Sequence, residues 1–382
     1  MAALKVAIPK ERRAHERRVA ATPETVKKMA GLGLAVAVES GAGVAASYQD
    51  DAYRAAGATV GDAASTLAGA NIVLKVQRPL EQGEGANELA SLPRGAILIG
   101  LLDPLMNQAQ VGAYAQAGIT SFAMELVPRI TRAQTMDALS SQSNLAGYKA
   151  VLDATEYFGK AMPLMMTAAG TIAPARVFVL GAGVAGLQAI ATAKRLGAIV
   201  TATDVRRAAA EQVESLGAAF IAPPDLNDAE AKGGYAKELD KDAQARQAAV
   251  VAEHLKKQDI AIATALIPGR KAPVLITADM IAGMKPGSVI IDLAVEQGGN
   301  VALSKPGEVV EVNGVKIVGH RNVPSRIAVD ASALYARNLL AFVQPLIEKG
   351  GALKINWDDE IVKGALLTRD GAVVNERLKP AA

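Results

Sequence analysis

The sequence contains no cysteine and only three histidines among its 382 residues. The absence of cysteine excludes disulfide bonds and thiolate metal sites, and it is compatible with a reducing cytosol. His15, His254 and His320 are scattered along the chain and form no metal-binding set, so we predict no metal site. The chain also lacks a basic run interleaved with aromatic residues, and 41 basic against 38 acidic residues leave a net charge of +3. Nucleic acid is therefore not an expected partner.

Long apolar segments are missing as well. Residues 1–7 have no apolar stretch of the kind found in a signal peptide, and no segment is expected to span a bilayer. A chain of 382 residues is longer than one hydrophobic core usually supports, which suggests two domains. With 51% hydrophobic and 21% charged residues, the composition is typical of a globular protein.

Residues 176–207 show the pattern of a strand, a glycine turn, a helix and a second strand. Gly181, Gly183 and Gly186 form the spacing G-x-G-x-x-G between the first strand and the helix. Amide N–H groups and the positive end of the helix dipole then face one point, where a pyrophosphate fits. Asp204 ends the second strand, where a carboxylate can accept hydrogen bonds from both hydroxyls of an adenosine ribose. The pattern predicts an NAD(H) site.

Two alternatives to this interpretation stay open. A glycine turn can serve only to pack a helix closely on a sheet. Arg206 and Arg207 follow Asp204, and a guanidinium beside the ribose is how NADP sites hold their extra phosphate. Such sites usually lose the acidic residue, and Asp204 would repel a 2′-phosphate, so we favour NAD(H).

Apolar runs and helical patterns alternate through the first 125 residues, which predicts a parallel sheet covered by helices on both faces. Runs near Val177, Ile199, Ala218, Ile260, Val289 and Val315 predict a second, six-stranded sheet. Because that sheet is then complete, the helix expected at 325–342 must pack on the first domain. We therefore predict an α/β fold of two Rossmann-like, doubly wound parallel-sheet domains with a deep cleft between them. The first domain is discontinuous (1–143 and 325–382), and the second spans 144–324.

Residues 124–149 form an unusually polar stretch for a region between two sheets. If a helix starts near Thr135, then Asp137, Ser140, Ser141 and Asn144 share one helix face. This polar face predicts a ligand contact, although a solvated domain hinge would also need polar residues. The long loop at 223–242 is either a lid, with Tyr235 folding over a bound nucleotide, or a disordered insertion.

A dehydrogenase that oxidises an alcohol or amine needs a general base, usually histidine. His15 and His320 are candidates, whereas His254 is expected on the surface of a helix. Arg18 and Lys75 follow or end strands at the edge where open α/β sheets bind ligands.

Six segments of the chain are distinctive: KVAIPKERR, RAQTMDALSSQSNLAGY, GAGVAGLQAIATAKRLGA, TALIPGRKAPVLIT, GSVIIDLAVEQGGN and GHRNVPSR. Together they resemble the NAD(H)-binding component of proton-translocating nicotinamide nucleotide transhydrogenase, over nearly the whole chain. The same superfamily includes alanine dehydrogenase, which has counterparts of Arg18 and Lys75. That enzyme would have a catalytic histidine after the strand that ends here as ILIGLLDPL, and an aspartate where this chain has Glu296. Both differences favour transhydrogenase.

The resemblance implies direct hydride transfer between NAD(H) and NADP(H). That step releases no proton, so it needs two nicotinamide rings held in near-attack geometry rather than a general base. The resemblance assigns Arg129, Gln134, Asp137 and Ser140 to the nicotinamide end as catalytic residues, with Tyr235 on a mobile loop. The full cofactor-binding set that we expect is Arg129, Ile130, Thr131, Gln134, Asp137, Ser140, Gly181, Ala182, Gly183, Val184, Gly186, Asp204, Val205, Arg206, Gly234, Gln247 and Leu266.

The resemblance further implies a homodimer, a partner subunit that binds NADP(H), and a membrane-spanning subunit that couples the reaction to proton movement. Because the sequence stops at Ala382, it resembles the separate soluble alpha subunit of some bacteria. We expect it in the cytoplasm, peripheral on the inner membrane through its partners. Two other functions stay open: an NAD-dependent alanine dehydrogenase that uses Lys75 and His15, and a non-catalytic NADH-binding module.

Overall fold

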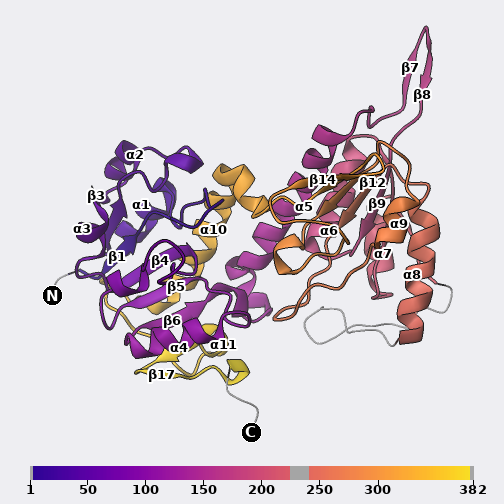
Figure 1. Ribbon diagram of the computed structural model, residues 1–382. Coiled ribbons are helices and arrows are strands. Elements are labelled where there is room, and N and C mark those ends of the chain that lie inside the picture. Colours follow the sequence, from indigo (N-terminus) through magenta and orange to yellow (C-terminus); the bar gives the residue numbers. More distant parts are fainter. Residues whose placement is uncertain (1–2, 224–240, 379–382) are drawn as a thin grey trace. The chain divides into compact units, whose positions relative to one another are not determined.

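The computed structural model describes residues 3–223 and 241–378. The chain divides into two compact units, one of residues 1–142 with 325–382 and one of residues 143–324. Each unit consists of a largely parallel sheet with helices on it (Figure 1). The predicted α/β class with parallel sheets is therefore confirmed.

The first unit has an eight-stranded sheet in the order β17-β16-β6-β5-β4-β1-β2-β3. Six strands are parallel, while β16 runs antiparallel to β6 and forms a hairpin with β17. The strands are β1 (Lys5–Ile8), β2 (Ala35–Glu39), β3 (Thr59–Gly61), β4 (Ile72–Gln77), β5 (Ile97–Leu101), β6 (Thr120–Ala123), β16 (Leu366–Arg369) and β17 (Ala372–Val373). The hairpin turns at Asp370 and Gly371, which both have positive φ, as a two-residue turn of this kind requires.

Helices cover both faces of this sheet. They are α1 (Pro23–Gly31), α2 (Asp50–Ala55), α3 (Ala63–Leu67), α4 (Gln108–Gln116), the start of α5 (Ala138–Tyr157), α10 (Ala328–Val343) and α11 (Glu360–Ala365). Thr22 caps α1 and Pro23 begins it. Alternate strand residues enter different cores: Val6 and Ile8 lie in one cluster and Ala7 in the other. The returning helix α10 adds Tyr335, among others, to the larger cluster.

The second unit has a seven-stranded sheet in the order β11-β10-β9-β12-β13-β15-β14. Its strands are β9 (Arg176–Leu180), β10 (Ile199–Thr203), β11 (Ala219–Phe220), β12 (Ile260–Ala263), β13 (Val289–Asp292), β14 (Val309–Val312) and β15 (Val315–Val318). The predicted count of six was wrong by one, because β14 pairs antiparallel with β15 at the sheet edge. The helices of this unit are the rest of α5, α6 (Val184–Arg195), α7 (Ala209–Ser215), α8 (Lys241–Leu255) and α9 (Ala278–Ala282).

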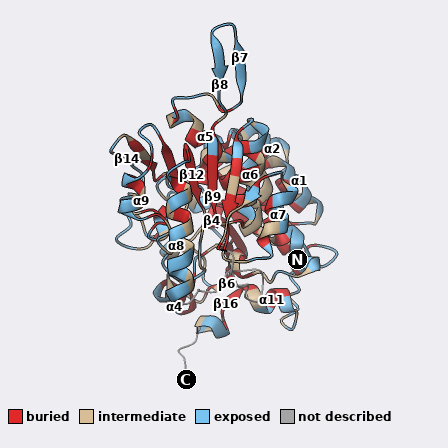
Figure 2. Cartoon of the chain, turned by 90° about the vertical axis from the view of Figure 1, so that its right-hand side faces the viewer, coloured by how far each residue is buried: buried red, intermediate tan, exposed pale blue. Residues whose placement is uncertain are grey.

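Burial in the second unit follows the same alternation. Val177 and Val179 enter one core cluster, and Phe178 and Leu180 enter the other. Both faces of the sheet are therefore covered, as a parallel sheet requires, and Figure 2 shows its central strands in red behind helices with pale-blue outer faces.

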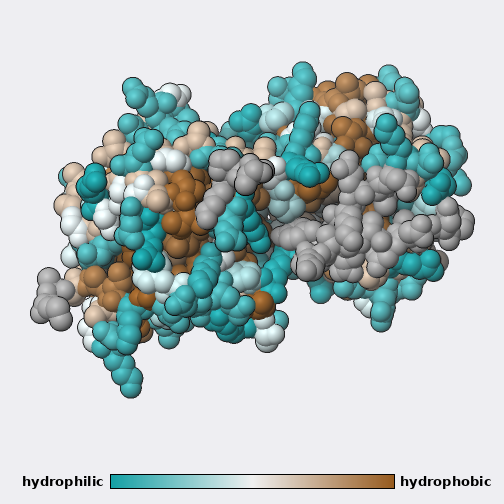
Figure 3. All heavy atoms as spheres, turned by 90° about the horizontal axis from the view of Figure 1, so that it is seen from below, coloured by the Kyte–Doolittle hydropathy of each residue, from teal (hydrophilic) through white to brown (hydrophobic). Residues whose placement is uncertain are grey.

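Polar side chains cover much of the face seen in Figure 3, with apolar side chains scattered among them. None of the described helices is long and apolar enough to cross a membrane.

A small hairpin interrupts the connection between α5 and β9. It consists of β7 (Met165–Thr167) and β8 (Gly170–Ile172), and it projects from the rest of its unit (Figure 1). All six strand residues are exposed. Sequence reasoning missed this hairpin because MPLMMTAAGTIAP contains neither alternation nor a strong turn signal.

Candidate functional site

The glycine turn of the second unit lies between β9 and α6. Gly181 has a φ of +101°, and a Cβ at this position would lie 2.7 Å from Thr264 Oγ1. A Cβ at Gly186 would lie only 1.8 Å from the carbonyl oxygen of Gly181. Packing within the protein therefore explains these two glycines. It does not explain Gly183, the N-cap of α6, because among the described residues no atom beyond its chain neighbours lies within 4 Å of the position its Cβ would take. The open space at Gly183 leaves room for a ligand at the helix N-terminus.

Asp204 follows β10 and closes onto this turn. Its Oδ2 accepts a hydrogen bond of 2.7 Å from the Ala182 amide, and its Oδ1 accepts one of 2.8 Å from the Arg206 amide. The guanidinium of Arg206 donates to both carboxylate oxygens, at 2.9 Å and 2.8 Å. Burial alone would raise the pKa of Asp204, but the hydrogen bonds from Arg206 and Ala182 outweigh it and hold that pKa below its usual value. The carboxylate is thus ionised and connects β10 to the glycine turn.

A third connection to the turn comes from the end of β12. The Thr264 hydroxyl donates to the carbonyl oxygens of Gly181, at 3.0 Å, and of Leu180, at 3.3 Å. The buried Asn300 side chain accepts from the Ala265 amide at 2.9 Å and donates to the Ala265 carbonyl at 2.9 Å. Leu266, a predicted cofactor contact, is the next residue and is 45% exposed.

Asn300 is in turn held by its neighbours. Its side-chain amide also donates to the Pro273 carbonyl at 2.8 Å, and its backbone amide donates to Asp292 at 3.1 Å. Burial raises the pKa of Asp292. Sequence reasoning did not identify Thr264 or Asn300, although both lie in the distinctive segments TALIPG and EQGGN. Their importance depends on which strand ends are neighbours, and no spacing in the sequence shows that.

Gln247 comes from α8, which begins at Lys241. Its side-chain amide donates to Thr203 Oγ1 at 2.6 Å, so it lies at the end of β10 beside Asp204. The other atom of the group, Oε1, is buried and has no hydrogen-bond partner among the described residues. Such an acceptor is open to a ligand donor. Gly234 and Tyr235, also predicted at the cofactor, lie outside the described residues.

A second cluster of predicted residues lies in the first unit. The short 3-10 helix η4 (Thr131–Met136) precedes α5, so the prediction of an α-helix starting near Thr135 was wrong. Asp137 lies between the two helices, and its carboxylate accepts from the Ser140 amide at 2.8 Å and from the Ser140 hydroxyl at 2.6 Å. It caps α5 and does not lie on the predicted polar face.

Arg129 completes this cluster, with its Nε 4.0 Å from Asp137 Oδ2. The structure therefore brings Arg129, Asp137 and Ser140 together. Ile130 packs against the core, whereas Thr131 and Gln134 are exposed on η4. Asn338 of α10, which sequence reasoning missed, holds this segment by donating to the Thr135 carbonyl at 2.8 Å.

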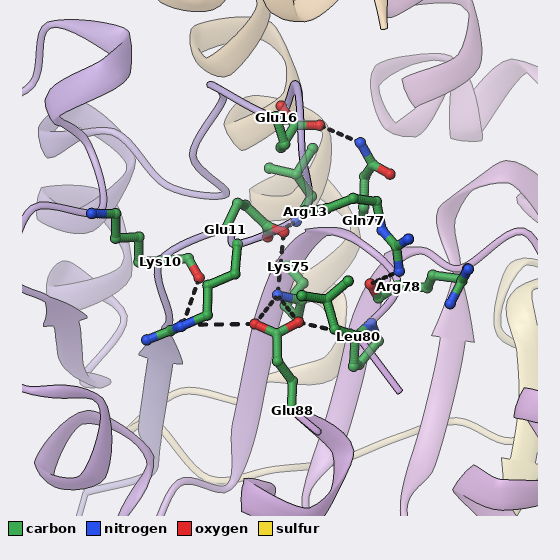
Figure 4. Close-up of polar contacts among 12 residues, drawn as sticks. Lys10, Glu11, Arg13, Glu16, Lys75, Gln77, Arg78, Leu80 and Glu88 are labelled. Carbon is green, nitrogen blue, oxygen red and sulfur yellow. Dashed lines mark hydrogen bonds and ion pairs between the residues drawn. The ribbon is translucent and has the colours of Figure 1, made fainter. Parts of the chain in front are cut away.

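Arg18 and Lys75 are both neutralised by carboxylates of the first unit. Arg18 is buried and donates to both oxygens of Glu16, at 2.9 Å and 2.7 Å, and to Gln142 at 2.8 Å. The Lys75 ammonium lies 3.2 Å from Glu11 and 3.3 Å from Glu88, and Figure 4 shows it between the two. A pocket of about 560 Å³ is lined in part by Lys75 and Glu88.

This arrangement matters for the alternative of an amino-acid dehydrogenase. The substrate carboxylate of such an enzyme would need a free cation, but three carboxylates of the chain already pair with these two cations. Burial is the main reason that the pKa of Glu11 is raised above its usual value; Lys75 lowers that pKa, and the charges of Glu16 and Glu88 raise it.

His254 and His320 contact residues other than the predicted site residues. His254 was expected on the surface, but it is half-buried, lies 2.8 Å from Thr201 Oγ1 and packs edge-on against Phe178. Burial lowers its pKa. His320 lies 3.3 Å from the Tyr157 hydroxyl. Among the described residues, no group of three or more His, Cys, Asp or Glu side chains could hold a metal ion.

Comparison with known families agrees with these motifs. The family model described as "Alanine dehydrogenase/PNT, N-terminal domain" matches residues 7–146, and the model described as "Alanine dehydrogenase/PNT, C-terminal domain" matches residues 150–376. The chain belongs to the alanine dehydrogenase/PNT family. Within this family its relatives place it on the transhydrogenase branch.

A protein from Rhodospirillum rubrum, named as the first portion of an NAD(P) transhydrogenase subunit alpha, is 59% identical over 379 residues, covering 98% of this chain and 99% of the relative. The solved structure of a transhydrogenase from Sinorhizobium meliloti superposes with a TM-score of 0.88 at 54% identity, covering 97% of this chain and 100% of the other. An alanine dehydrogenase from Halomonas elongata is 32% identical, covering 96% of this chain and 94% of the relative. The predicted resemblance and the predicted transhydrogenase class of enzyme are confirmed.

Proposed function

We propose that the chain binds NAD(H) at the glycine turn of its second unit and passes hydride directly between NAD(H) and NADP(H) held on a partner subunit. Two observations support this most: the turn leaves open space at Gly183, and the chain is 59% identical over 379 residues to a protein named as part of a transhydrogenase subunit alpha. The open space at Gly183 takes the pyrophosphate, and the Oε1 of Gln247 is an acceptor open to the adenosine end.

The cluster in the first unit takes the nicotinamide end. Arg129, Asp137 and Ser140 restrain one another by hydrogen bonds and charge, and Gln134 projects from η4. These groups orient a carboxamide and a ribose, and hydride transfer from one C4 to another requires no proton transfer at that step. Rate acceleration then comes from the alignment of two rings, for which ordered polar groups suffice.

A single assay tests this proposal against both alternatives. The chain is mixed with NADH, an oxidised NAD analogue and an NADP(H)-binding partner subunit, and reduction of the analogue is followed by absorbance. We expect reduction only when the partner and NADP(H) are both present. Activity with alanine and NAD alone would overturn the proposal in favour of an alanine dehydrogenase. Tight NADH binding without hydride transfer in the full mixture would favour a binding module.

We also propose that the chain is a homodimer, and the β7–β8 hairpin supports this. Its apolar side chains are exposed, with Met166 at 81% and Ile172 at 44%. An isolated two-stranded hairpin is only marginally stable in water, so a second copy of the chain is a suitable cover. Met166→Asp should shift sedimentation toward the monomer. Val274→Asp, at an apolar residue 57% exposed elsewhere in the unit, should leave the dimer intact. Equal behaviour of the two variants would contradict the proposal.

The remaining partner is a membrane-spanning subunit that couples hydride transfer to proton movement. The chain then works in the cytoplasm, bound to the inner membrane through its partners. Vesicles that contain the partner subunits should retain the chain in flotation, whereas protein-free vesicles should not. Retention by protein-free vesicles would contradict this location.

A further inference from the structure

Two arginines of the first unit, Arg13 and Arg78, direct their guanidinium groups at one carboxylate, that of Glu84. Nη1 and Nη2 of Arg13 donate to its two oxygens at 2.8 Å and 3.2 Å. Nη2 and Nη1 of Arg78 donate to the same two oxygens at 2.7 Å and 2.9 Å. These hydrogen bonds hold the pKa of Glu84 well below its usual value, so the carboxylate is ionised. Each arginine is bidentate, which is the geometry in which guanidinium groups bind carboxylates and phosphates.

The two arginines lie at the edge of the sheet where open α/β sheets bind ligands. Arg13 is on the loop after β1, and Arg78 follows β4, which pairs in parallel with β1. Figure 4 shows the Arg13 side chain reaching the backbone of Arg78, where its Nη2 lies 3.5 Å from the carbonyl oxygen. The carboxyl ends of two neighbouring parallel strands therefore present both guanidinium groups together.

Both cations are held by contacts that do not involve Glu84. The side chains of Arg13 and Arg78 are 20% and 18% exposed, and Arg78 Nη1 also donates to the buried Gln110 side chain at 3.0 Å. Gln110 is fixed in turn, because its amide donates to the Pro79 carbonyl at 2.7 Å. Arg13 Nε is buried and has no hydrogen-bond partner among the described residues. The pair thus keeps a donor that Glu84 does not use.

Glu84 itself comes from the exposed tip of a short loop, residues 80–88. It is exposed and lies between two glycines of positive φ. The base of the loop is fixed separately, because the Glu88 carboxylate accepts from the Leu80 amide at 2.8 Å and lies 3.3 Å from the Lys75 ammonium. The tip can therefore leave the arginines while the base stays in place. Ion pairs of exposed side chains contribute little to stability, so a dissolved anion can compete with Glu84.

We propose that Arg13 and Arg78 form a binding site for a phosphate group, and that Glu84 occupies this site as an internal substitute which the phosphate displaces. A phosphate dianion matches the charge of two guanidinium groups better than one carboxylate does. The charges of Glu81 and Asp103 also act on Arg78, but neither side chain forms an ion pair with it among the described residues. The site is separate from the glycine turn of the second unit, so it does not depend on the proposed binding of NAD(H).

The test is a calorimetric titration of the full chain with inorganic phosphate in a phosphate-free buffer. Glu84→Gln is the decisive variant, because it removes the charge that competes for the arginines. Glu81→Gln is the matched control, since it removes a charge from the same loop without breaking an ion pair to Arg78. Arg13→Gln and Arg78→Gln are each combined with Glu84→Gln. Thermal unfolding shows which variants fold, and Glu84→Asp, with a shorter side chain, replaces Glu84→Gln should that variant not fold.

We expect the native chain to bind phosphate with a Kd of about 1–10 mM and Glu84→Gln to bind it about 10-fold more tightly, which corresponds to about 1.4 kcal/mol. Glu81→Gln should gain no more than about twofold, because screened charges without contact act weakly. Either arginine substitution should abolish binding to the Glu84 variant. Phosphate bound at the glycine turn would instead be unaffected by these two substitutions.

Phenyl phosphate, titrated in the same way, separates two sources of the phosphate group. Binding at least as tight as that of inorganic phosphate identifies a phosphate monoester as the ligand, and its absence identifies the free ion. The inference is overturned if a folded Glu84 variant binds no phosphate up to about 50 mM. It is also overturned if binding survives the loss of either arginine, or if the native chain and Glu84→Gln bind phosphate equally.

Discussion

The two clusters of predicted site residues are built in opposite ways. In the second unit, the glycine turn is held by hydrogen bonds from Asp204 and Thr264, which come from neighbouring strand ends, and the supporting Asn300 is fully buried. In the first unit, Arg129 and Asp137 keep 37% and 26% of their side chains exposed, and Gln134 is exposed. The proposed nucleotide site is thus a backbone turn that buried hydrogen bonds hold in place. The groups proposed for the nicotinamide lie on the short 3-10 helix η4 or next to it in the sequence, and Arg129 and Gln134 stay exposed. The proposed step between two nucleotides needs such accessible groups.

The largest loss of stability and of NADH binding should come from substitution in the glycine turn of the second unit. Gly186→Val would place side-chain atoms against the Gly181 carbonyl, which is already only 1.8 Å from a Cβ at this position. We expect the melting temperature to fall by about 10 °C or more and NADH binding to be lost, because α6 must move off the sheet. Thermal unfolding and fluorescence titration measure the two effects.

Gly183→Ala is the matched control, because no atom of the described residues beyond its chain neighbours lies within 4 Å of the Cβ position and the φ of −78° suits alanine. Its melting temperature should change by no more than about 2 °C, while NADH binding weakens about 10-fold as the methyl group fills the pyrophosphate space. Unchanged binding in this variant would show that the turn does not hold the pyrophosphate.

The next largest effect should be a loss of the transhydrogenation rate on substitution in the first-unit cluster that contains Gln134. Gln134→Ala should lower the transhydrogenation rate at saturating nucleotide about 100-fold, with NADH affinity within about threefold and the melting temperature unchanged. The exposed Gln116→Ala in the same unit is the control and should behave like the native chain. A loss of NADH affinity that matches the loss of rate would assign Gln134 to binding rather than to alignment of the rings.

A smaller loss of stability and of NADH binding is expected at Asn300, which supports the glycine turn through Ala265. Asn300→Ala would leave the amide and carbonyl of Ala265 and the carbonyl of Pro273 without their side-chain partner. Each unsatisfied buried group costs about 1–3 kcal/mol before water enters. We expect a melting temperature lower by about 5 °C and NADH binding weaker by about 10-fold. Asn300→Asp, which retains the acceptor for the Ala265 amide, should recover part of the binding. Equal losses in both variants would contradict this.

The smallest effect concerns how the stability of the first unit depends on pH at Glu125. Burial raises the pKa of Glu125 from 4.5 to about 7, and its Oε2 has no hydrogen-bond partner among the described residues. Between these two values the folded chain keeps a proton that the unfolded chain loses, so stability should fall as pH rises from about 4.5 to about 7. Glu125→Gln should remove this slope and raise the melting temperature by a few degrees at about pH 8. Melting curves recorded from about pH 5 to about pH 8 test it, and parallel curves for both proteins would contradict it.

Much of this fold could be predicted because its signals are local. The structure has the strand, glycine turn and helix at 176–195 where the spacing of apolar residues and glycines predicts them. The predicted start of α5 near Thr135 was wrong. Polar residues at helical spacing do not show whether Asp137 caps the helix or lies on one of its faces, and the structure has Asp137 as the cap. The β7–β8 hairpin was missed because its six exposed residues follow no burial pattern.

The sequence by itself determined the α/β class, the dinucleotide motif and the family, since periodicity, glycine spacing and extended motifs are written along the chain. Only the tertiary structure decided that Asp204 binds the guanidinium of Arg206, that Thr264 and Asn300 support the turn, and that carboxylates neutralise Arg18 and Lys75. The physical reason is that the direction of a side chain depends on the donors and charges that neighbouring strands bring to it. Residues far apart in the sequence become neighbours only when the parallel strands assemble in order.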